Sequence, residues 1–431
     1  MTNTFQLLLM LLMSYHSRPL LALPVRHATT RRTLSTTLSA VTADSVASYL
    51  NQPPTDAEVF ALSSFLHQKR RLVVVTGAGV STSSGIPDYR GPQGSYKLGH
   101  KPMMHQDFVK SEAARKRYWA RSMLGWSTFA QARINDAHLA LANLESHGII
   151  STVITQNVDR LHQKAGSLAV IDLHGRNDRV SCLTCQCNLS RRLLQTQIDQ
   201  LNPSFRTRID LEVARLQAVD AATSRSTATT TATATDTATS GVESRRGDEE
   251  SATASSLRAA RGLLNEVERR VIPDWPVGAE GKVVRATKGA VAQATAPPIS
   301  STNPMASVLR ADGDAELGMT DFSAFMVPSC PRCSTGILKP DVVFFGDSVH
   351  PSRVQDAYSA VEQCDGMLVV GTSLEVYSAF RFVDRASKSG KPIAIVNMGS
   401  TRAEREQLPG IVFKSESNCA ALLKQVADQI I

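Results

Sequence analysis

Five short apolar runs, each ending in small or polar residues, constrain the fold of this chain more than any other feature. Each run is rich in Val, Ile or Phe and does not alternate apolar with polar residues, as expected for strands buried on both faces of a parallel sheet. Helical stretches such as 57–69, 137–146 and 352–363 lie between them. This alternation of strands and helices predicts a doubly wound α/β fold. The runs are Leu72–Val75, Val153–Ile154, Val342–Phe345, Met367–Val370 and Ile393–Val396.

The residues that follow these runs predict where a ligand binds. The carboxyl ends of parallel strands meet at one edge of the sheet, and ligands bind in the crevice outside that edge. We therefore expect one crevice to collect the residues that end the runs. In chain order, the first residues after the runs are Thr76-Gly77-Ala78-Gly79, Thr155-Gln156-Asn157, Gly346-Asp347, Gly371-Thr372-Ser373 and Asn397-Met398-Gly399.

The size and charge of the chain fit an ordinary soluble globular protein better than a nucleic-acid-binding one. A length of 431 residues allows one large domain with additions, or two domains. The formal net charge is +8, but half of the excess lies in residues 1–43, which hold four Arg and no acid. The chain contains no block of five or more basic residues and no interleaving of basic with aromatic residues. We therefore expect no direct nucleic-acid binding.

Residues 1–43 have the composition of a targeting presequence. They mix Leu and Met with Arg, Ser and Thr, and the first acid is Asp44. The apolar run Leu7–Met13 is too short to cross a bilayer, which needs about 20 residues, so no membrane span is expected. We expect import into the mitochondrial matrix, with a plastid as the alternative. A secretory signal or a disordered tail also fits this composition.

The middle of the chain has a different composition. Residues 221–256 consist mainly of Thr, Ala and Ser, and such a segment cannot bury enough apolar surface to offset its conformational entropy. Sequence rich in Ala, Pro and Gly continues to about residue 317. We therefore assign residues 206–320 to a low-complexity insertion within a loop, and we expect 221–256 to be disordered.

The spacing of the cysteines predicts a metal site. Four of the seven cysteines form two C-x-x-C pairs that flank the insertion: Cys182 with Cys185, and Cys330 with Cys333. Four thiolates suit tetrahedral zinc and leave no open coordination position, so this zinc should be structural. Cys187 offers a competing C-x-C pairing with Cys185. Two reduced pairs without metal are the alternative.

The first run leads into a glycine turn. In Gly77-Ala78-Gly79-Val80-Ser81, the glycines would let backbone N–H groups approach a pyrophosphate. The turn departs from the dinucleotide fingerprint G-x-G-x-x-G because Thr82 occupies the third glycine position. Taken alone, the segment fits nucleotide binding or an ordinary tight turn.

Together with later motifs, this turn resembles the sirtuin family of NAD-consuming enzymes. The motifs occur in the family's order, with the cysteine pairs between the third and the fourth, and the resemblance covers about 57–205 and 320–431. The sequences of Arg117–Arg121 and Lys339–Asp347 further resemble the sirtuin-4-like branch of class II, which is mitochondrial in animals. The motifs are Gly77–Ser81 with Gly85–Arg90, Thr155–Asp159, Leu173-His174-Gly175, and Gly371-Thr372-Ser373 with Asn397.

The resemblance implies an architecture and an activity. It implies a catalytic domain over 44–431, with Rossmann-like parts 57–175 and 336–431 and a zinc module of 176–205 and 320–335. The implied activity is NAD-dependent deacylation of lysines in protein substrates, in which NAD is cleaved to nicotinamide and the acyl group moves to ADP-ribose. A protein ADP-ribosyltransferase with the same pocket and a non-catalytic NAD-sensing module are the alternatives. The oligomeric state is left open.

The resemblance also implies the roles of individual residues. His174 becomes the general base, since an imidazole can take a proton from a ribose hydroxyl near neutral pH; the residue alone would equally fit a packed histidine at a strand end. Asn157 and Asp159 hold the carboxamide pocket and are grouped with His174 as catalytic. The other implied cofactor contacts are Gly77, Ala78, Gly79, Ser81, Ile86, Pro87, Asp88, Tyr89, Arg90, Tyr96, Gln156, Val158, Gly371, Thr372, Ser373, Asn397, Met398, Gly399 and Cys419.

A further set of residues matches the edge to which sirtuins add a substrate peptide as an extra strand. This set is Val343, Phe344, Phe345 and Gly346, and core packing explains the two phenylalanines equally well. In the class II branch that removes dicarboxylic acyl groups, a Tyr-x-x-Arg pair binds the free carboxylate of the acyl group. Here Tyr96 is followed at that spacing by Gly99, which argues against such selectivity. The family pattern ends at Cys185, so Cys187 is left outside the zinc ligands.

Overall fold

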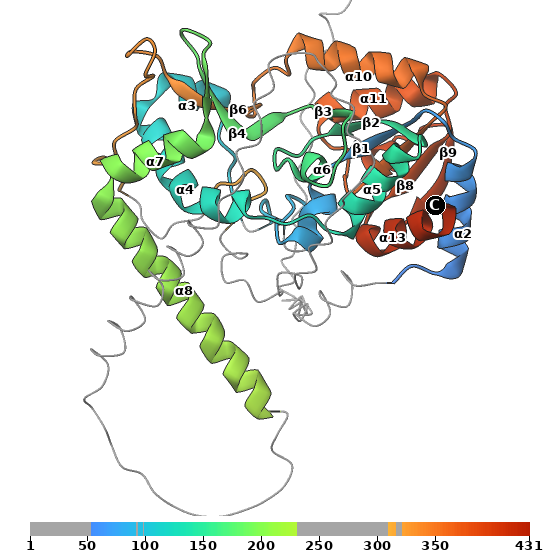
Figure 1. Ribbon diagram of the computed structural model, residues 1–431, viewed down its shortest axis with the longest axis horizontal. Helices are drawn as coiled ribbons and strands as arrows, with labels where there is room; N and C mark the ends of the chain where they lie inside the picture. The colour runs from blue at the N-terminus through green and yellow to red at the C-terminus, as the bar shows by residue number, and fades with distance from the viewer. Residues whose placement is uncertain (1–52, 92–93, 98, 231–308, 316–320) are drawn as a thin grey trace, which may run out of the picture. The chain divides into compact units, whose positions relative to one another are not determined.

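A parallel sheet of six strands carries the larger part of the fold (Figure 1). The computed structural model describes residues 53–91, 94–97, 99–230, 309–315 and 321–431, so the expected presequence lies outside the described residues. All pairings in this sheet are parallel, and Val46–Ile431 forms one compact unit. In spatial order the strands are β3 (Val170–Asp172), β2 (Ile150–Thr155), β1 (Leu72–Thr76), β7 (Gly366–Val370), β8 (Ile393–Val396) and β9 (Ile411–Ser415).

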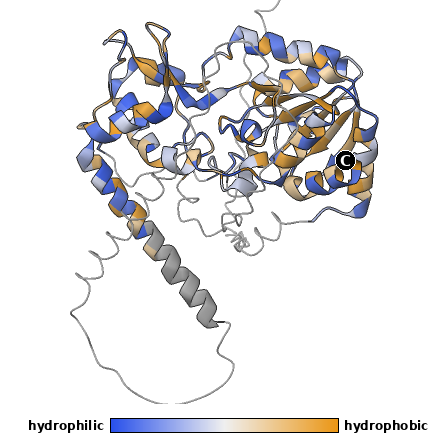
Figure 2. Cartoon of the chain, viewed as in Figure 1, coloured by the Kyte–Doolittle hydropathy of each residue, from blue (hydrophilic) through white to orange (hydrophobic). Residues whose placement is uncertain are grey.

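Helices cover both faces of this sheet, and its central strands consist mainly of apolar residues (Figure 2). Leu72 and Val74 face one hydrophobic cluster, whereas Val73 and Val75 face the other, because successive side chains of a strand point to opposite sides. The doubly wound α/β fold is thereby confirmed. One face is covered by α2 (Asp56–His67), α5 (Asp136–Ser146) and α13 (Cys419–Ile430), and the other by α10 (Pro351–Gln363), α11 (Tyr377–Lys388) and α12 (Arg402–Arg405).

A smaller antiparallel sheet has its own core. Its order is β5 (Asn188–Ser190), β4 (Gly175–Cys182) and β6 (Leu338–Val342). The guanidinium of Arg191 lies over the rings of Trp119 and Trp126, at 4.7 and 5.0 Å, and so joins two of the helices around this sheet. These helices are α3 (His105–Lys110), α4 (Glu112–Ala130), α7 (Arg191–Leu201) and the first part of α8 (Pro203–Thr230).

The expected strand Val342–Phe345 is wrong as a member of the parallel sheet. The strand β6 lies earlier, at Leu338–Val342, and pairs antiparallel with β4. Phe344 is buried, but among the rings of Phe108 and Tyr118, each 5.3 Å away. An apolar run does not distinguish a strand from a loop segment that enters a core. The sequence analysis also missed β3 and β9 at the two edges of the parallel sheet.

The expected domain boundaries and insertion also need correction. Helices α3 and α4 lie in the stretch assigned to the Rossmann-like part, yet they pack into the core that holds Cys182 and Cys330. Helix α8 continues to Thr230, so 206–230 is helical, including the part of 221–256 that the structure describes. Apolar Phe205 and Ile209 anchor the start of α8 in that core. Residues 231–308 and 316–320 lie outside the described residues.

The segment 309–315, near the end of the expected insertion, is packed against the body of the protein. Leu309 and Ala315 pair in an antiparallel bridge and are buried. The side-chain amide of Asn177 donates to the carbonyl oxygen of Asp312 at 2.9 Å, and Nε of Arg121 donates to that of Ala315 at 3.1 Å. A Cβ added at Gly125 of α4 would overlap the carbonyl oxygen of Gly313. Helix α4 thus needs a glycine where this segment crosses it.

Two short elements remain among the residues that the structure describes: the 3₁₀ helix η1 (Ala78–Ser84) and α6 (Leu161–Lys164). Among the described residues, no helix is both long enough and apolar enough to cross a bilayer.

We expect Gly125→Ala to destabilise the protein by about 1–3 kcal/mol, because the added methyl group must displace the backbone of Gly313. At an ordinary helix position the same change stabilises by about 1 kcal/mol. Urea unfolding followed by circular dichroism measures the difference. The pair Arg117→Ala and Arg117→Gly, at an exposed position of α4, isolates the helix-propensity contribution. A Gly125→Ala protein that is more stable than wild type would contradict this packing.

Candidate active site and metal centre

The turns that follow β1 and β7 touch each other at the carboxyl edge of the parallel sheet. The backbone N–H of Gly79 donates to the carbonyl oxygen of Gly371 at 2.9 Å. A Cβ at Gly77 would lie 2.6 Å from Cβ of Thr372, and one at Gly79 would lie 2.8 Å from the oxygen of Gly371. Both glycines are therefore required for the contact between the turns. The contact joins the turn that contains Ala78 to the turn that contains Thr372 and Ser373.

A buried polar network follows the end of β2. The hydroxyl of Ser81 donates to the carboxylate of Asp159 at 2.7 Å and accepts from the side-chain amide of Asn157 at 3.0 Å. The second carboxylate oxygen of Asp159 accepts from the backbone N–H of Leu161 at 2.9 Å. The amide of Gln156 donates to the hydroxyl of Thr372 at 2.9 Å. These bonds fix Asn157 and Asp159 before any ligand binds.

His174 lies between the two sheets, immediately after Leu173 and before the start of β4. Its Nε2 is 2.7 Å from the hydroxyl oxygen of Ser378, and its backbone oxygen accepts from the N–H of Val343 at 2.8 Å. The ring also forms a hydrogen bond with the backbone of Gln156. Burial, partly opposed by this bond, lowers the pKa of His174 to about 4. The imidazole is therefore neutral at pH 7 and able to accept a proton.

The hydrogen bonds of His174 also indicate its tautomer. For Nε2 to accept a proton, the proton of the neutral ring must be on Nδ1. The lone pair then lies on Nε2 and accepts from the hydroxyl of Ser378. No sequence motif pointed to Ser378, which lies in the first turn of α11 and 204 residues beyond His174.

The segment after η1 is folded back on itself. The N–H of Tyr96 donates to the oxygen of Tyr89 at 3.0 Å, and the guanidinium of Arg90 lies 5.0 Å from the centre of the Tyr96 ring. Burial raises the pKa of Asp88, whose carboxylate accepts from the N–H of Gly91. The structure thus groups Arg90 with both tyrosines. Ile86 is buried in the core beneath them, and Pro87 connects it to Asp88.

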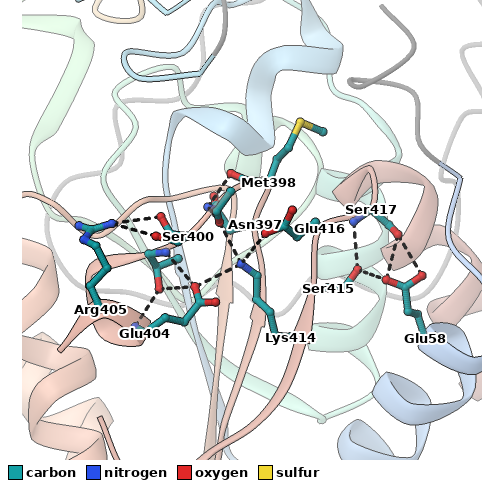
Figure 3. A network of polar contacts seen from close by, with 12 residues as sticks. Glu58, Asn397, Met398, Ser400, Glu404, Arg405, Lys414, Ser415, Glu416 and Ser417 are labelled. Atoms are coloured by element: carbon teal, nitrogen blue, oxygen red, sulfur yellow. Dashed lines mark hydrogen bonds and ion pairs between the residues drawn. The ribbon is translucent and has the colours of Figure 1, made fainter. Parts of the chain in front are cut away.

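The ends of β8 and β9 form a second polar network, drawn in Figure 3. The side-chain amide of Asn397 donates to the carbonyl oxygens of Met398 and Gly399, at 2.9 and 3.0 Å. The ammonium of Lys414 donates to the oxygen of Gly399 at 2.9 Å and pairs with Glu404 at 3.2 Å. Sequence reasoning found Asn397, Met398 and Gly399 here but missed Lys414, which no motif marks.

The same edge includes two further groups. Glu58 of α2 accepts from the hydroxyls of Ser415 and Ser417, at 2.7 and 3.0 Å (Figure 3). The sulfur of Cys419 lies 3.8 Å from the carbonyl oxygen of Gly79, so this cysteine does lie beside the glycine turn. Burial raises the pKa of Cys419 to about 11, which keeps it a thiol at neutral pH.

The expected peptide edge divides into a buried and an exposed part. The side chain of Phe344 is in the core, so direct contact of this ring with a peptide is excluded in the present arrangement. Phe345 is 39% exposed, and its ring lies 6.3 Å from that of Tyr96. Gly346 is exposed, and Val343 is partly buried with its N–H bonded to His174.

The hydrogen-bonding and charged groups at the sheet edge fit NAD. The amides of Gln156 and Asn157 and the carboxylate of Asp159 match the hydrogen-bonding needs of a carboxamide and of ribose hydroxyls. Arg90 provides a positive charge for a pyrophosphate.

Four thiols in the smaller sheet region form a candidate metal centre. The ligand atoms of Cys182, Cys185, Cys330 and Cys333 all lie within 4.8 Å of one another. Sulfur–sulfur distances are 3.7 Å for Cys182 to Cys333 and for Cys185 to Cys330. A tetrahedral zinc with Zn–S bonds of about 2.3 Å requires sulfur–sulfur distances of about 3.8 Å. The four residues therefore fit structural zinc.

Comparison with known proteins gives the same assignment. Residues 77–219 and 307–378 match the Sir2 family. The chain is 40% identical over 348 residues to an NAD-dependent protein deacetylase of Bordetella bronchiseptica, which covers 81% of this chain and 91% of the relative. It is 35% identical over 353 residues to an NAD-dependent protein deacylase of Arabidopsis thaliana, which covers 82% of this chain and 72% of the relative.

Solved structures show the same fold. A Sir2 enzyme matches with a TM-score of 0.50 at 22% identity, over 87% of this chain and 98% of that one. A Sir2 protein with a deacetylated peptide and an acetyl ADP ribose also gives a TM-score of 0.50, at 21% identity, over 86% and 98% of the two chains. Given the sequence relatives and the motifs assembled at the sheet edge, this chain belongs to the Sir2 family, the sirtuins.

Proposed function

We propose that this sirtuin is an NAD-dependent protein-lysine deacylase with one structural zinc per chain. The observation that carries the proposal is the neutral imidazole of His174, which is held at the same sheet edge as the Asn157–Asp159 network. The names of the relatives, protein deacetylases and a deacylase, support it.

Each polar group at the edge has a role in this proposal. NAD supplies the ribose that accepts the acyl group, with nicotinamide as the leaving group. Asn157 and Asp159 orient the carboxamide, and Ser81 keeps the Asp159 carboxylate in place. Nε2 of His174 takes the proton of a ribose hydroxyl. The hydroxyl of Ser378 keeps its hydrogen bond to that nitrogen until the ribose hydroxyl replaces it, so Ser378 acts as a positioning residue.

The acyl group that fits this site is uncharged. Gly99 stands where a guanidinium would be needed to bind a second carboxylate. The carboxylate of Asp312, from the segment 309–315, contributes to raising the pKa of Tyr89 and of Tyr96, after the larger effect of burial. At Tyr96 the guanidinium of Arg90 lowers the pKa and outweighs Asp312, so the preference for an uncharged acyl group rests on Gly99.

The finer assignment within the family is also part of the proposal. We place the chain in the class II, sirtuin-4-like branch, supported by Arg117–Arg121 and Lys339–Asp347. Some of these residues have structural roles, since Tyr118 and Trp119 are core and Lys339 pairs with Asp347 at 3.1 Å. A mitochondrial matrix location, with a plastid as the alternative, rests on the composition of residues 1–43. A fluorescent protein fused to these residues that fails to enter either organelle would refute it.

A panel of acyl-lysine peptides with NAD, analysed by mass spectrometry, tests the activity. We expect acyl-ADP-ribose as a product and higher kcat/KM for uncharged acyl groups than for succinyl or malonyl groups. An unpaired carboxylate in a partly dry site costs several kcal/mol. Highest efficiency on a succinyl peptide would contradict the acyl assignment. ADP-ribose attached to protein, without acyl-ADP-ribose, would favour the ADP-ribosyltransferase.

Substitution of the base should separate two steps of the reaction. His174→Ala should lower deacylation by about 10²–10⁴-fold, the usual contribution of a general base. It should retain NAD binding and exchange of labelled nicotinamide, because departure of nicotinamide needs no base. Asn157→Ala should lower both activities, since this amide orients the cofactor. Deacylation by His174→Ala at a rate near wild type would show that another group is the base.

The pH dependence of kcat/KM tests the hydrogen bond from Ser378. Only neutral His174 can accept a proton. Because its pKa is about 4, activity should be lost at a pH well below the ordinary histidine pKa of about 6.5. Protonation of His174 should therefore leave kcat/KM of the wild-type protein unchanged from pH 8 down to about pH 5. In Ser378→Ala, Nε2 loses a donor that favours the neutral form, so activity should begin to fall at a higher pH. Ser378→Thr should restore the wild-type profile, and an unchanged profile in Ser378→Ala would exclude the proposed role.

A further inference from the structure

A fifth thiol lies at the metal centre. The sulfur of Cys187 is 3.5 Å from that of Cys330, closer than the 3.7 Å between Cys185 and Cys330. The backbone holds it there: Gln186 has a left-handed conformation, with φ of 57°, and the N–H of Cys182 donates to the oxygen of Cys187 at 3.0 Å. Cys187 remains outside the set of four whose ligand atoms all lie within 4.8 Å of one another, but the fold places its sulfur against one member of that set, Cys330.

The five thiols differ in their access to solvent. Tetrahedral zinc takes four ligands, so five thiols leave one in excess. Cys330 is 1% exposed, whereas Cys187 is partly exposed. A small oxidant in solution therefore reaches Cys187 more readily than Cys330, and the product of that oxidation would lie directly against Cys330.

We propose that Cys187 is an oxidation site that controls zinc binding: a peroxide converts it into a disulfide with Cys330, and the zinc is released. In the first step the thiolate sulfur of Cys187 attacks one peroxide oxygen, the O–O bond breaks, and a sulfenic acid and one water form. In the second step the thiolate of Cys330 leaves the metal and attacks the sulfenic sulfur, which expels the second water. The two thiolates together lose two electrons, and hydrogen peroxide takes these electrons and two protons from the solvent to become two waters.

The geometry suits this reaction. A disulfide has its sulfurs about 2 Å apart, so the two sulfur atoms need to approach by about 1.5 Å. Loss of Cys330 leaves the metal with three thiolates in a site that has lost its closed coordination. Since the affinity of a structural zinc is also folding free energy, its release weakens the smaller sheet.

The effect reaches the candidate active site through two strands. Strand β4 begins at Gly175, next to His174, and ends at the ligand Cys182. Strand β6 pairs with it, and Val343, the residue after β6, donates its N–H to the oxygen of His174 at 2.8 Å. Zinc release should therefore lower activity as a consequence of oxidation, although the zinc contacts no reacting group.

The full-length zinc protein, treated with hydrogen peroxide, tests the proposal without any measurement of activity. A zinc-binding dye follows metal release, and mass spectrometry of the digested protein identifies the linked cysteines. We expect release from wild type together with a Cys187–Cys330 link, and recovery with dithiothreitol and added zinc. Release from Cys187→Ser should be about ten-fold slower or more, since the reactive sulfur is absent.

The matched control is Cys364→Ser, which removes a thiol in the core of the parallel sheet and keeps a donor to Val361. It should release zinc as wild type does. Three results would overturn the proposal: release from Cys187→Ser at the wild-type rate, a link between two other cysteines as the main product, or Cys187→Ser that is purified without zinc. The last would make Cys187 an ordinary ligand. None of these depends on whether the protein is a deacylase.

Discussion

The parallel pairing of β1 with β2 on one side and β7 on the other determines where the functional groups of this protein lie. Thr76, the last residue of β1, is aligned with Thr155 and with Val370, so the three strands end together. Because these strands are buried on both faces, a shift of one residue would exchange the side chains that pack into the two cores. The glycine turn, the Gln156–Asp159 segment and the turn at Gly371 consequently meet at one edge. The hydrogen bonds among them hold the candidate NAD-binding groups ready without a ligand.

The candidate base occupies the junction between two differently built sheets. Strand β3 of the parallel sheet ends at Asp172, and strand β4 of the antiparallel sheet begins at Gly175, so His174 is fixed from both sides. The candidate zinc ligands lie at the other end of the smaller sheet. A structural metal there would influence His174 without contacting it. The same arrangement makes the excess thiol of Cys187 significant, since a change at the metal centre acts on the strands that hold the base.

Electrostatics separate the roles of the groups at the site. Burial keeps His174 neutral and Cys419 protonated, so the first can accept a proton and the second is not a nucleophile at neutral pH. The carboxylate of Asp159 keeps its position through Ser81 and the backbone of Leu161. The segment 309–315 adds the carboxylate of Asp312, which contributes to raising the pKa of Tyr89 and of Tyr96 after the larger effect of burial.

The sequence by itself determined the features that have a local pattern: strands buried on both faces, two C-x-x-C pairs with zinc spacing, and the motifs that resemble sirtuins. It did not determine which strand pairs with β6, that Phe344 is buried, or that 309–315 packs against the body of the protein. Nor did it determine the contact of Ser378 with His174 or the position of Cys187 against Cys330. Ser378 and His174 are 204 positions apart, and Cys187 and Cys330 are 143 apart. Contacts over such separations leave no periodicity or spacing in the chain. They depend on how strands and helices pack, so only the tertiary structure could decide them.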